Sequence, residues 1–374
     1  MYAAYLMIIV INIFFASIKK YSRVILILSM GLLLVLVAGN VAGADVHSYL
    51  IMYEGAKKGV NLHGEIGYYA LEYLFAHVLK WNFWLFRLFI VILCYGLVFK
   101  GISYFSVSKH WIIAMYMGYL FIMDTIQFRN FLAMSLLVFA FHYLMSDDKK
   151  EWIKYVFFII IAATFQVIIL YTLSFLIYKC KNKKIMNGLI VFVAVTSFGI
   201  SLINRDKINP IFSFIINNLL EGRGANYLSQ RTHNAPIGII GLYCIDMCIL
   251  IYIYMLKKKH MNEEQQKYHD YIWRIHCLLI LIFPLLLRSI SFYRIIRNVC
   301  LLKYIDYAKM IDRLKINTVH RFILVFAISI SIFLWGFVDC ILINPFEVVV
   351  EPIFEKNCFW GIDRAPSIMK FFLS

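Results

Sequence analysis

Hydrophobic residues in this chain form long runs rather than an alternating pattern. Apolar stretches of roughly 17–25 residues recur from one end of the sequence to the other, and this is the length at which a helix crosses the hydrocarbon core of a bilayer. Membrane-spanning strands would instead be about 10 residues long and would alternate apolar with polar positions. The pattern therefore predicts an all-α polytopic membrane protein.

Charged loops divide these runs into about 11–12 transmembrane segments, a count that includes a short re-entrant-like hairpin. The predicted single spans are Met1–Ser17, Val24–Ala42, Phe83–Phe99, Trp111–Met123, Phe128–Leu144, Ile185–Ile203, Ile237–Leu256, Tyr271–Leu287, Phe292–Ala308 and Phe322–Ile343. Met1–Ser17 has no basic residues before it and no small-residue cleavage site after it, so we expect it to be a retained span rather than a cleaved signal.

Two further segments are not predicted to be simple spans: one is an apolar run with lysines on both sides, and the other is amphipathic. The apolar run Trp152–Tyr178 has lysines on both sides, so it must turn back near Gln166, as a re-entrant-like hairpin, if both flanks are cytoplasmic. The alternative is one span that leaves Lys179–Lys184 outside, against the positive-inside bias. Gly64–Lys80 is predicted to be an interfacial helix, because Glu65, Tyr69, Glu72 and Ala76 share one side.

The composition is also that of a membrane protein, and the positions of the basic residues explain the positive net charge. The chain is 62% hydrophobic and only 16% charged, whereas soluble domains are about 25% charged. Its net charge of +16 comes largely from short basic loops such as Lys19–Arg23 and Lys257–Lys259. That distribution sets membrane orientation and gives no reason to expect a nucleic-acid partner. It predicts that both termini lie outside.

We expect a single transmembrane domain over residues 1–374. Its predicted external parts are a loop at 43–82, a loop at 204–236 and a C-terminal tail at 344–374. The eight cysteines are scattered and the histidines lack ligand spacing, so no metal site is predicted.

The most unusual polar stretch is Asp124–Ala133, which places Asp124, Gln127 and Arg129 between two strongly apolar runs. Ionisable groups at membrane depth are rare unless they are paired or functional. Two interpretations stay open. Arg129 either snorkels to the headgroups beside Asp124, or forms one wall of an anionic-lipid site in which Gln127 and Asp124 orient it.

Arginines gather again at the predicted outer end of a later span. Arg288, Arg294 and Arg297 fall within ten residues, and guanidinium groups suit phosphate because they are bidentate donors that stay charged. We expect the intramembrane charges to gather on this outer side, together with Arg223 and Arg231 of the loop 204–236. The alternative is that these arginines only anchor the protein at the headgroups.

Several short motifs follow the order seen in a known family. They are Gly43-Ala44-Asp45 followed by Tyr49 and Tyr53, then Glu65-Ile66-Gly67-Tyr68, then Phe128–Ala133 and an apolar hairpin. In these motifs and in hydropathy the chain resembles the EpsG family, which is grouped with Wzy-type polysaccharide polymerases of bacterial surface-glycan pathways. The family usually has a histidine at the hairpin turn. This chain has Gln166, which can bind a sugar but cannot carry a proton.

The resemblance implies a GT-C-like glycosyltransferase of the bacterial inner membrane. We expect it to be metal-independent and to need no cofactor, because arginines could stabilise the charge of the leaving group. It would transfer a glycan from polyprenyl diphosphate onto another lipid-linked repeat unit, and a chain-length regulator is an expected partner. Two alternatives stay open: a glycan ligase that uses the same donor, and a flippase or other transporter, which needs a polar pathway into the cytoplasmic half.

The expected site residues follow from these roles. Asp45 or Glu65 is expected to be the catalytic base, with Asp45 preferred. Arg288, Arg294 and Arg297, together with Arg129, are expected to stabilise the leaving diphosphate in place of a metal ion. The residues expected to bind substrate are Tyr49, Gln127, Gln166, Arg223, Arg231, Arg288, Arg294 and Arg297.

Overall fold

The computed structural model describes residues 1–43, 45–61, 65–179, 188, 192, 195–196, 235–287, 289–313 and 318–359. In this part of the chain every regular element is a helix, and one isolated bridge joins Asn40 to Asn357. The prediction of an all-α polytopic membrane protein is confirmed. Most of the predicted span Ile185–Ile203 and of the loop 204–236 lies outside the described residues.

Five described helices are long and apolar enough to cross a membrane. They are Phe83–Ser103, Phe128–Met145, Pro236–Leu256, Gln266–Leu286 and Val319–Ile343, and shorter apolar helices cover Tyr2–Ser17, Arg23–Gly39 and Val167–Ile177. Each of these segments overlaps a run that hydropathy had predicted. The continuous hydrogen bonding of a helix satisfies the backbone in lipid, which explains why apolar runs fold in this way.

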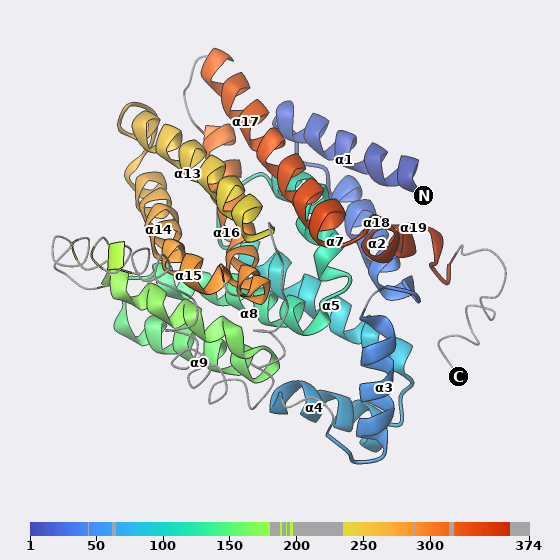
Figure 1. Cartoon of the computed structure of the whole chain (residues 1–374). Helices are drawn as coiled ribbons and strands as arrows, with labels where there is room; N and C mark the ends of the chain where they lie inside the picture. The colour runs from blue at the N-terminus through green and yellow to red at the C-terminus, as the bar shows by residue number, and fades with distance from the viewer. Residues whose placement is uncertain are drawn as a thin grey trace.

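The first part of the chain forms a pair of short apolar helices and a small helical unit at one end of the molecule (Figure 1). The helices are α1 (Tyr2–Ser17), α2 (Arg23–Gly39), α3 (Val46–Lys57), α4 (Ile66–Tyr73), its π-helical continuation η1 (Leu74–Val78) and α5 (Phe83–Ser103). The predicted amphipathic helix is present as α4 and η1. Its buried side is formed by Tyr68, Glu72, Phe75 and Ala76, while Tyr69 is only partly buried.

The predicted span Trp111–Met123 is not one continuous helix. Helix α6 (Lys109–Gly118) ends at Tyr119, where φ is −151°, and α7 (Leu120–Asp124) follows it. Helix α8 (Phe128–Met145) then runs through the middle of the molecule and packs on α5. The break has a consequence for the site, because it turns the Tyr119 hydroxyl toward a buried carboxylate described below.

The run Trp152–Tyr178 forms two packed segments, as the hairpin hypothesis predicts. Helix α9 (Lys149–Phe165) ends at Gln166, which is extended (φ −153°, ψ 104°), and the 3-10 helix η2 (Val167–Lys179) returns along it. The Tyr155 hydroxyl donates to the carbonyl of Thr172 at 2.8 Å. The turn therefore lies near the position that the flanking lysines indicated.

The last helices complete the bundle. They are α13 (Ala235–His260), α14 (Glu263–Leu279), η3 (Ile280–Ile282), α15 (Phe283–Leu286), η4 (Ile290–Phe292), α16 (Tyr293–Arg313), α17 (Thr318–Phe337), η5 (Val338–Ile343), α18 (Phe346–Val349) and α19 (Glu351–Glu355). Within the predicted C-terminal tail, α19 packs on α2, and the Cys358 amide donates to the Gly39 carbonyl at 2.8 Å.

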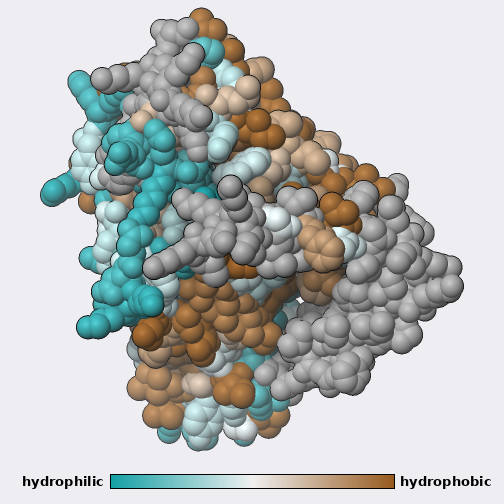
Figure 2. All heavy atoms as spheres, turned by 90° about the vertical axis from the view of Figure 1, so that its left-hand side faces the viewer, coloured by the Kyte–Doolittle hydropathy of each residue, from teal (hydrophilic) through white to brown (hydrophobic). Residues whose placement is uncertain are grey.

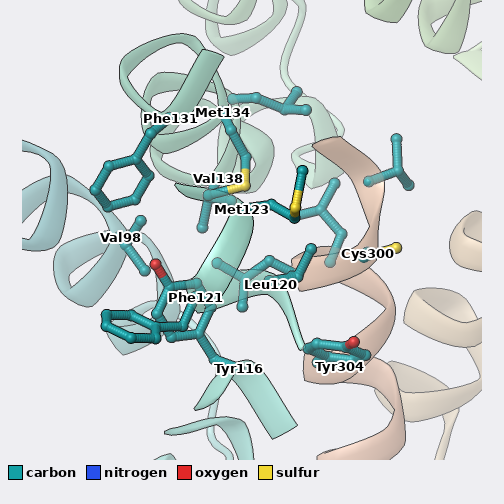
Figure 3. Packing of buried hydrophobic residues seen from close by; sticks show 14 of the residues in the cluster. Val98, Tyr116, Leu120, Phe121, Met123, Phe131, Met134, Val138, Cys300 and Tyr304 are labelled. Atoms are coloured by element: carbon teal, nitrogen blue, oxygen red, sulfur yellow. The ribbon is translucent and has the colours of Figure 1, made fainter. Parts of the chain in front are cut away.

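The core lies where α7 packs between α8 and α16, next to α6 (Figure 3). Leu120 and Phe121 contribute from α7, Phe131 from α8 and Tyr304 from α16, and all four are at most 1% exposed. Lipid chains are as apolar as leucine, so van der Waals fit and polar pairs hold such helices together, rather than exclusion of water.

The surface agrees with a lipid-facing protein. Figure 2 shows a broad hydrophobic area beside a hydrophilic strip on one face of the molecule. Met255 of α13 is 71% exposed and Phe322 of α17 is 70% exposed. Contiguous exposed apolar surface of this kind marks an interaction site or a membrane-facing side.

Candidate functional site

Arg129 and Glu65 form an ion pair, which joins two of the motifs that resemble the known family, Phe128–Ala133 and Glu65–Tyr68. Arg129 lies in the first turn of α8 and Glu65 is the residue before α4, and Arg129 Nη1 is 2.5 Å from Glu65 Oε2. Their side chains are 18% and 17% exposed, and the guanidinium group lies 5.7 Å from the ring centre of Tyr49. Arg129 is therefore held inside the protein, which favours the site interpretation over snorkelling.

The two expected partners of Arg129 bond to other residues. Asp124 is 1% exposed and accepts a hydrogen bond from the Tyr116 hydroxyl at 3.0 Å. Gln127 Oε1 accepts a hydrogen bond from Arg297. The hypothesis that Asp124 and Gln127 orient Arg129 was wrong. The reason is tertiary packing: Tyr116 of α6 reaches Asp124, and Arg297 of α16 reaches Gln127.

Arg297 is almost completely buried, with 2% exposure, and is paired. Its Nη1 lies 3.4 Å from Asp339 Oδ2, and the hydroxyls of Tyr119 and Tyr293 donate to the same oxygen at 2.8 Å and 2.9 Å. The charge of Arg297 is therefore balanced by Asp339, which was not among the predicted site residues.

Both arginines keep a donor that the protein does not use. The Nε atoms of Arg129 and Arg297 are buried and have no hydrogen-bond partner in the described part of the chain. Buried donors are normally satisfied. A bound anion would satisfy them.

A reciprocal amide pair fixes the two arginine-bearing helices against each other. Asn130 Nδ2 donates to Asn298 Oδ1 at 2.7 Å, and Asn298 Nδ2 donates to Asn130 Oδ1 at 3.1 Å. Both side chains are at most 2% exposed. Since Asn130 follows Arg129 and Asn298 follows Arg297, this pair sets the register of α8 against α16 at the site.

Asp45 lies among these positive charges. It is the residue before α3, yet its side chain makes no capping bond, so the carboxylate is not used to hold the helix. Burial raises the pKa of Asp45, while the charges of Arg294, Arg129 and Arg297 lower it in part. The structure thus brings Asp45, Arg129, Arg294 and Arg297 into one electrostatic neighbourhood, as the charge-derived topology predicted.

Arg87 supports this neighbourhood from α5 and was not among the predicted residues. It is 2% exposed, and its guanidinium group donates to the carbonyl of Asn40 at 2.5 Å and to that of Thr125 at 3.5 Å. Asn40 lies at the end of α2, just before Asp45, and Thr125 precedes Gln127. A single arginine inside the apolar span Phe83–Phe99 was the signal that could have identified it.

The end of α9, next to the hairpin turn, contacts α4 at Gly67, a residue of the motif Glu65–Tyr68. A Cβ atom on Gly67 would overlap the Thr164 side chain and would lie 3.0 Å from the Thr164 carbonyl. Only glycine allows α4 to lie this close to the end of α9. Gln166 is next to this contact and is partly exposed, and its side chain has no hydrogen-bond partner among the residues that the structure covers.

Three of the expected substrate-binding residues, Arg223, Arg231 and Arg288, lie outside the described residues. Tyr49 is 6% exposed and packs between Tyr68 and Phe128, with ring centres 6.0 Å away from its own in each case. It shapes the wall beside Arg129.

Buried charge also extends along α16 away from Arg297, which corrects the expectation that the intramembrane charges gather on one side. Lys303 pairs with Asp246 of α13, and Asp306 lies 2.8 Å from His269 Nδ1 of α14. At about 1.5 Å per residue, these groups lie roughly 9 and 13 Å beyond Arg297 along the helix axis. In the described residues no three His, Cys, Asp or Glu side chains converge to hold a metal ion.

Comparison with known proteins places the chain in a family. Neither a search of curated proteins nor a search of solved structures finds a match. A family model does match, over residues 23–347, which include Asp45, Glu65, Arg129, Arg297 and Asp339. The match covers most of the chain, and the protein belongs to the EpsG family.

Proposed function

We propose that this protein elongates a surface polysaccharide by transferring a polyprenyl-diphosphate-linked glycan onto a second lipid-linked repeat unit at the outer face of the cytoplasmic membrane. The EpsG family is a family of Wzy-like polysaccharide polymerases. The observation that carries the proposal is the partly buried Asp45 carboxyl group, which feels the charges of Arg294, Arg129 and Arg297. One acid beside several cations suits a reaction in which a hydroxyl loses a proton while a diphosphate leaves.

The arginines stabilise the leaving group in this mechanism. As the glycosidic bond to the diphosphate breaks, negative charge grows on the diphosphate oxygens, and preorganised donors stabilise that charge more than they stabilise the ground state. Arg129 and Arg297 each have a free Nε donor among the described contacts, and Arg294 acts most strongly of the three on Asp45.

Asp45 is the better candidate for the base. The acceptor hydroxyl attacks the anomeric carbon and its proton passes to the Asp45 carboxylate, which needs to lie within hydrogen-bond reach of the hydroxyl. Glu65, the other candidate, is already in an ion pair with Arg129. We assign Glu65 the role of positioning that arginine.

The test is polymerisation by purified protein in liposomes that contain lipid-linked repeat units. A ladder of products of increasing length supports a polymerase, and a single capped product indicates a ligase. The reaction is repeated with excess chelator, because the proposed charge stabilisation comes from arginines. An unchanged ladder would support stabilisation by arginines. If chelator abolishes the ladder and added Mg²⁺ restores it, the proposed stabilisation by arginines is contradicted.

A transporter of lipid-linked glycans is the second candidate, and the charged pairs along α16 are the observation in its favour. Those pairs are tightly packed: Lys303, Ser331 and Trp335 together satisfy both oxygens of Asp246. Movement of labelled lipid-linked unit across liposomes without any product ladder would identify a transporter.

A further inference from the structure

A groove between α2 and α5 is separate from the site described above. It has a volume of about 590 Å³ and is lined by apolar side chains with Arg23 at one end, together with Met30, Tyr95 and Phe99. This volume is within the range of about 300–1,000 Å³ that ligand pockets occupy. A smaller cavity of about 30 Å³ shares Met30, Tyr95 and Phe99 with the groove and reaches Lys109 of α6.

Two cations lie at the same end of this groove. Arg23 begins α2 and Lys109 begins α6. The residues beside them are joined, because the Ser22 amide donates to His110 Nε2 at 3.1 Å. Neither cation has an ion-pair partner in the described part of the chain, and Lys109 Nζ lies 4.3 Å from the ring centre of Phe99.

The groove holds no opposing charge. No carboxylate lines either the groove or the smaller cavity. Two glycines, Gly31 of α2 and Gly96 of α5, keep the groove open, since a Cβ atom added to either would meet nothing within 4 Å. An apolar channel with two cations at one end is complementary to an anion that carries a hydrocarbon chain.

We propose that this groove binds one anionic phospholipid, with its phosphate on Arg23 and Lys109 and an acyl chain along Gly31 and Gly96. Basic pockets between transmembrane helices bind anionic headgroups in this way. The positive-inside distribution predicts that Lys19–Arg23 and Lys100–Lys109 face the cytoplasm, and the cytoplasmic leaflet is the one rich in anionic lipid.

The glycan carrier is a poor occupant on geometric grounds. Its diphosphate has to reach Asp45, which lies beyond the far end of α2 from Arg23. Sixteen residues separate Arg23 from Gly39, which is roughly 24 Å along a helix. A lipid phosphate held at Arg23 is therefore not the reacting diphosphate, and the groove is a distinct lipid site.

The experiment measures which lipid the purified protein retains in native mass spectrometry, after equilibration with equal amounts of anionic and zwitterionic phospholipids of the same chain length. The wild type is expected to retain the anionic lipid preferentially. R23Q and K109Q should each reduce that preference by about fivefold, the effect of one cation near a lipid surface. K150Q, which removes an exposed lysine on another helix, should leave it unchanged.

Substitutions that fill the groove provide a second, independent test of the lipid site. G31L and G96L should lower the retention of lipid of either charge, whereas G241L, at a glycine with open space on α13, should not. Two substitutions on different helices are used so that misfolding of one variant does not decide the result. The proposal is overturned if retention is the same in R23Q, K109Q and wild type, if G31L and G96L retain lipid normally, or if added polyprenyl phosphate displaces the phospholipid.

Discussion

Asp45 combines a partly buried carboxyl group with nearby positive charge, and these two effects act on its pKa in opposite directions. Burial is the larger effect and raises the pKa, while Arg294, Arg129 and Arg297 lower it. A base is most effective when its pKa approaches the working pH. In the proposed reaction the same surroundings would stabilise negative charge on a leaving diphosphate, so one arrangement of residues would serve both halves of the transfer.

The pH dependence of the reaction should reflect Asp45. Its deprotonated form is the active one, so the rate should fall as the pH drops through a pKa that burial places above that of an ordinary aspartate. R294Q removes the strongest lowering charge and should move this fall to higher pH. Initial rates across pH measure it. If the fall in rate at low pH occurs at the same pH in R294Q as in the wild type, the assignment of Asp45 as the base is contradicted.

The same shift affects stability with a definite sign. Because the folded-state pKa is raised, the unfolded chain binds fewer protons between the two pKa values. The contribution of Asp45 to stability is therefore fully present below the unfolded-state pKa and is lost as the pH rises through the folded-state pKa. D45N should remove this part of the pH dependence in thermal melting.

Asp339 is expected to act through Arg297. D339N leaves Arg297 without its balancing charge and allows it to move, and a misplacement of about 1 Å can reduce a rate roughly 100-fold. Y293F removes one donor to the carboxylate and should have a smaller effect, because a hydrogen bond contributes about 1 kcal/mol. The measurement separates kcat from KM. D147N, at an exposed surface pair, is the control, and equal activity of D339N and D147N would rule out this role.

At the scale of elements, polar contacts fix how the helices meet. The Asn130–Asn298 pair holds α8 against α16, and Arg87 ties the end of α2 to the segment before α8. Hydrogen bonds between helices in lipid contribute about 0.6–2 kcal/mol each. They therefore add modest stability, and their larger effect here is to set the register that brings Asp45 and the arginines together.

A substitution at Gly67 tests whether the close approach of α4 to α9 is needed for activity. G67A should push α4 away from α9, move Glu65 and so weaken its hold on Arg129, with a loss of activity although no charged residue is changed. Removing the opposing side chain in G67A/T164G should restore part of the activity. G241A, at an open position, is the control. Wild-type activity of G67A would show that the close approach is not needed.

The Asp246–Lys303 pair should contribute to stability rather than to chemistry. It joins α13 to α16, and Trp335 of α17 donates to Asp246 while its ring stacks on Tyr293 at 5.6 Å. D246N leaves Lys303 buried and unpaired, which should cost about 3–5 kcal/mol. D246N/K303M should recover much of that loss. Thermal unfolding in detergent measures it, and a double variant less stable than D246N would contradict this assignment.

At the scale of the whole molecule, hydropathy and charge predicted more than local chemistry did. The apolar runs predicted the helices because the backbone in lipid has few alternatives, and the loop charges predicted that Asp45, Arg129 and Arg294 share a neighbourhood. Partners distant in sequence were not predictable. Asp339 lies 42 residues from Arg297, and neither residue's local pattern specifies the other.

The break at Tyr119 shows a second limit of the sequence. An apolar run has the same hydropathy whether its helix is straight or broken, so nothing in Trp111–Met123 indicated that Tyr119 would turn toward Asp339. The assignment of Gln127 to Arg129 failed for a related reason, because the partner of Gln127 is Arg297, 170 residues away in the sequence. Tertiary packing decided the direction of these side chains, and periodicity carries no information about it.

The most direct test of the central claim is the length of product made by D45N in liposomes that contain lipid-linked repeat units. Removing a general base reduces rates by about 10²–10⁴-fold, so D45N should give no ladder under conditions in which the wild type gives a full one, while its thermal melting shows that it is folded. H47N, two residues away on the exposed side of α3, should polymerise normally. A D45N variant that is folded and produces a wild-type ladder would contradict the account.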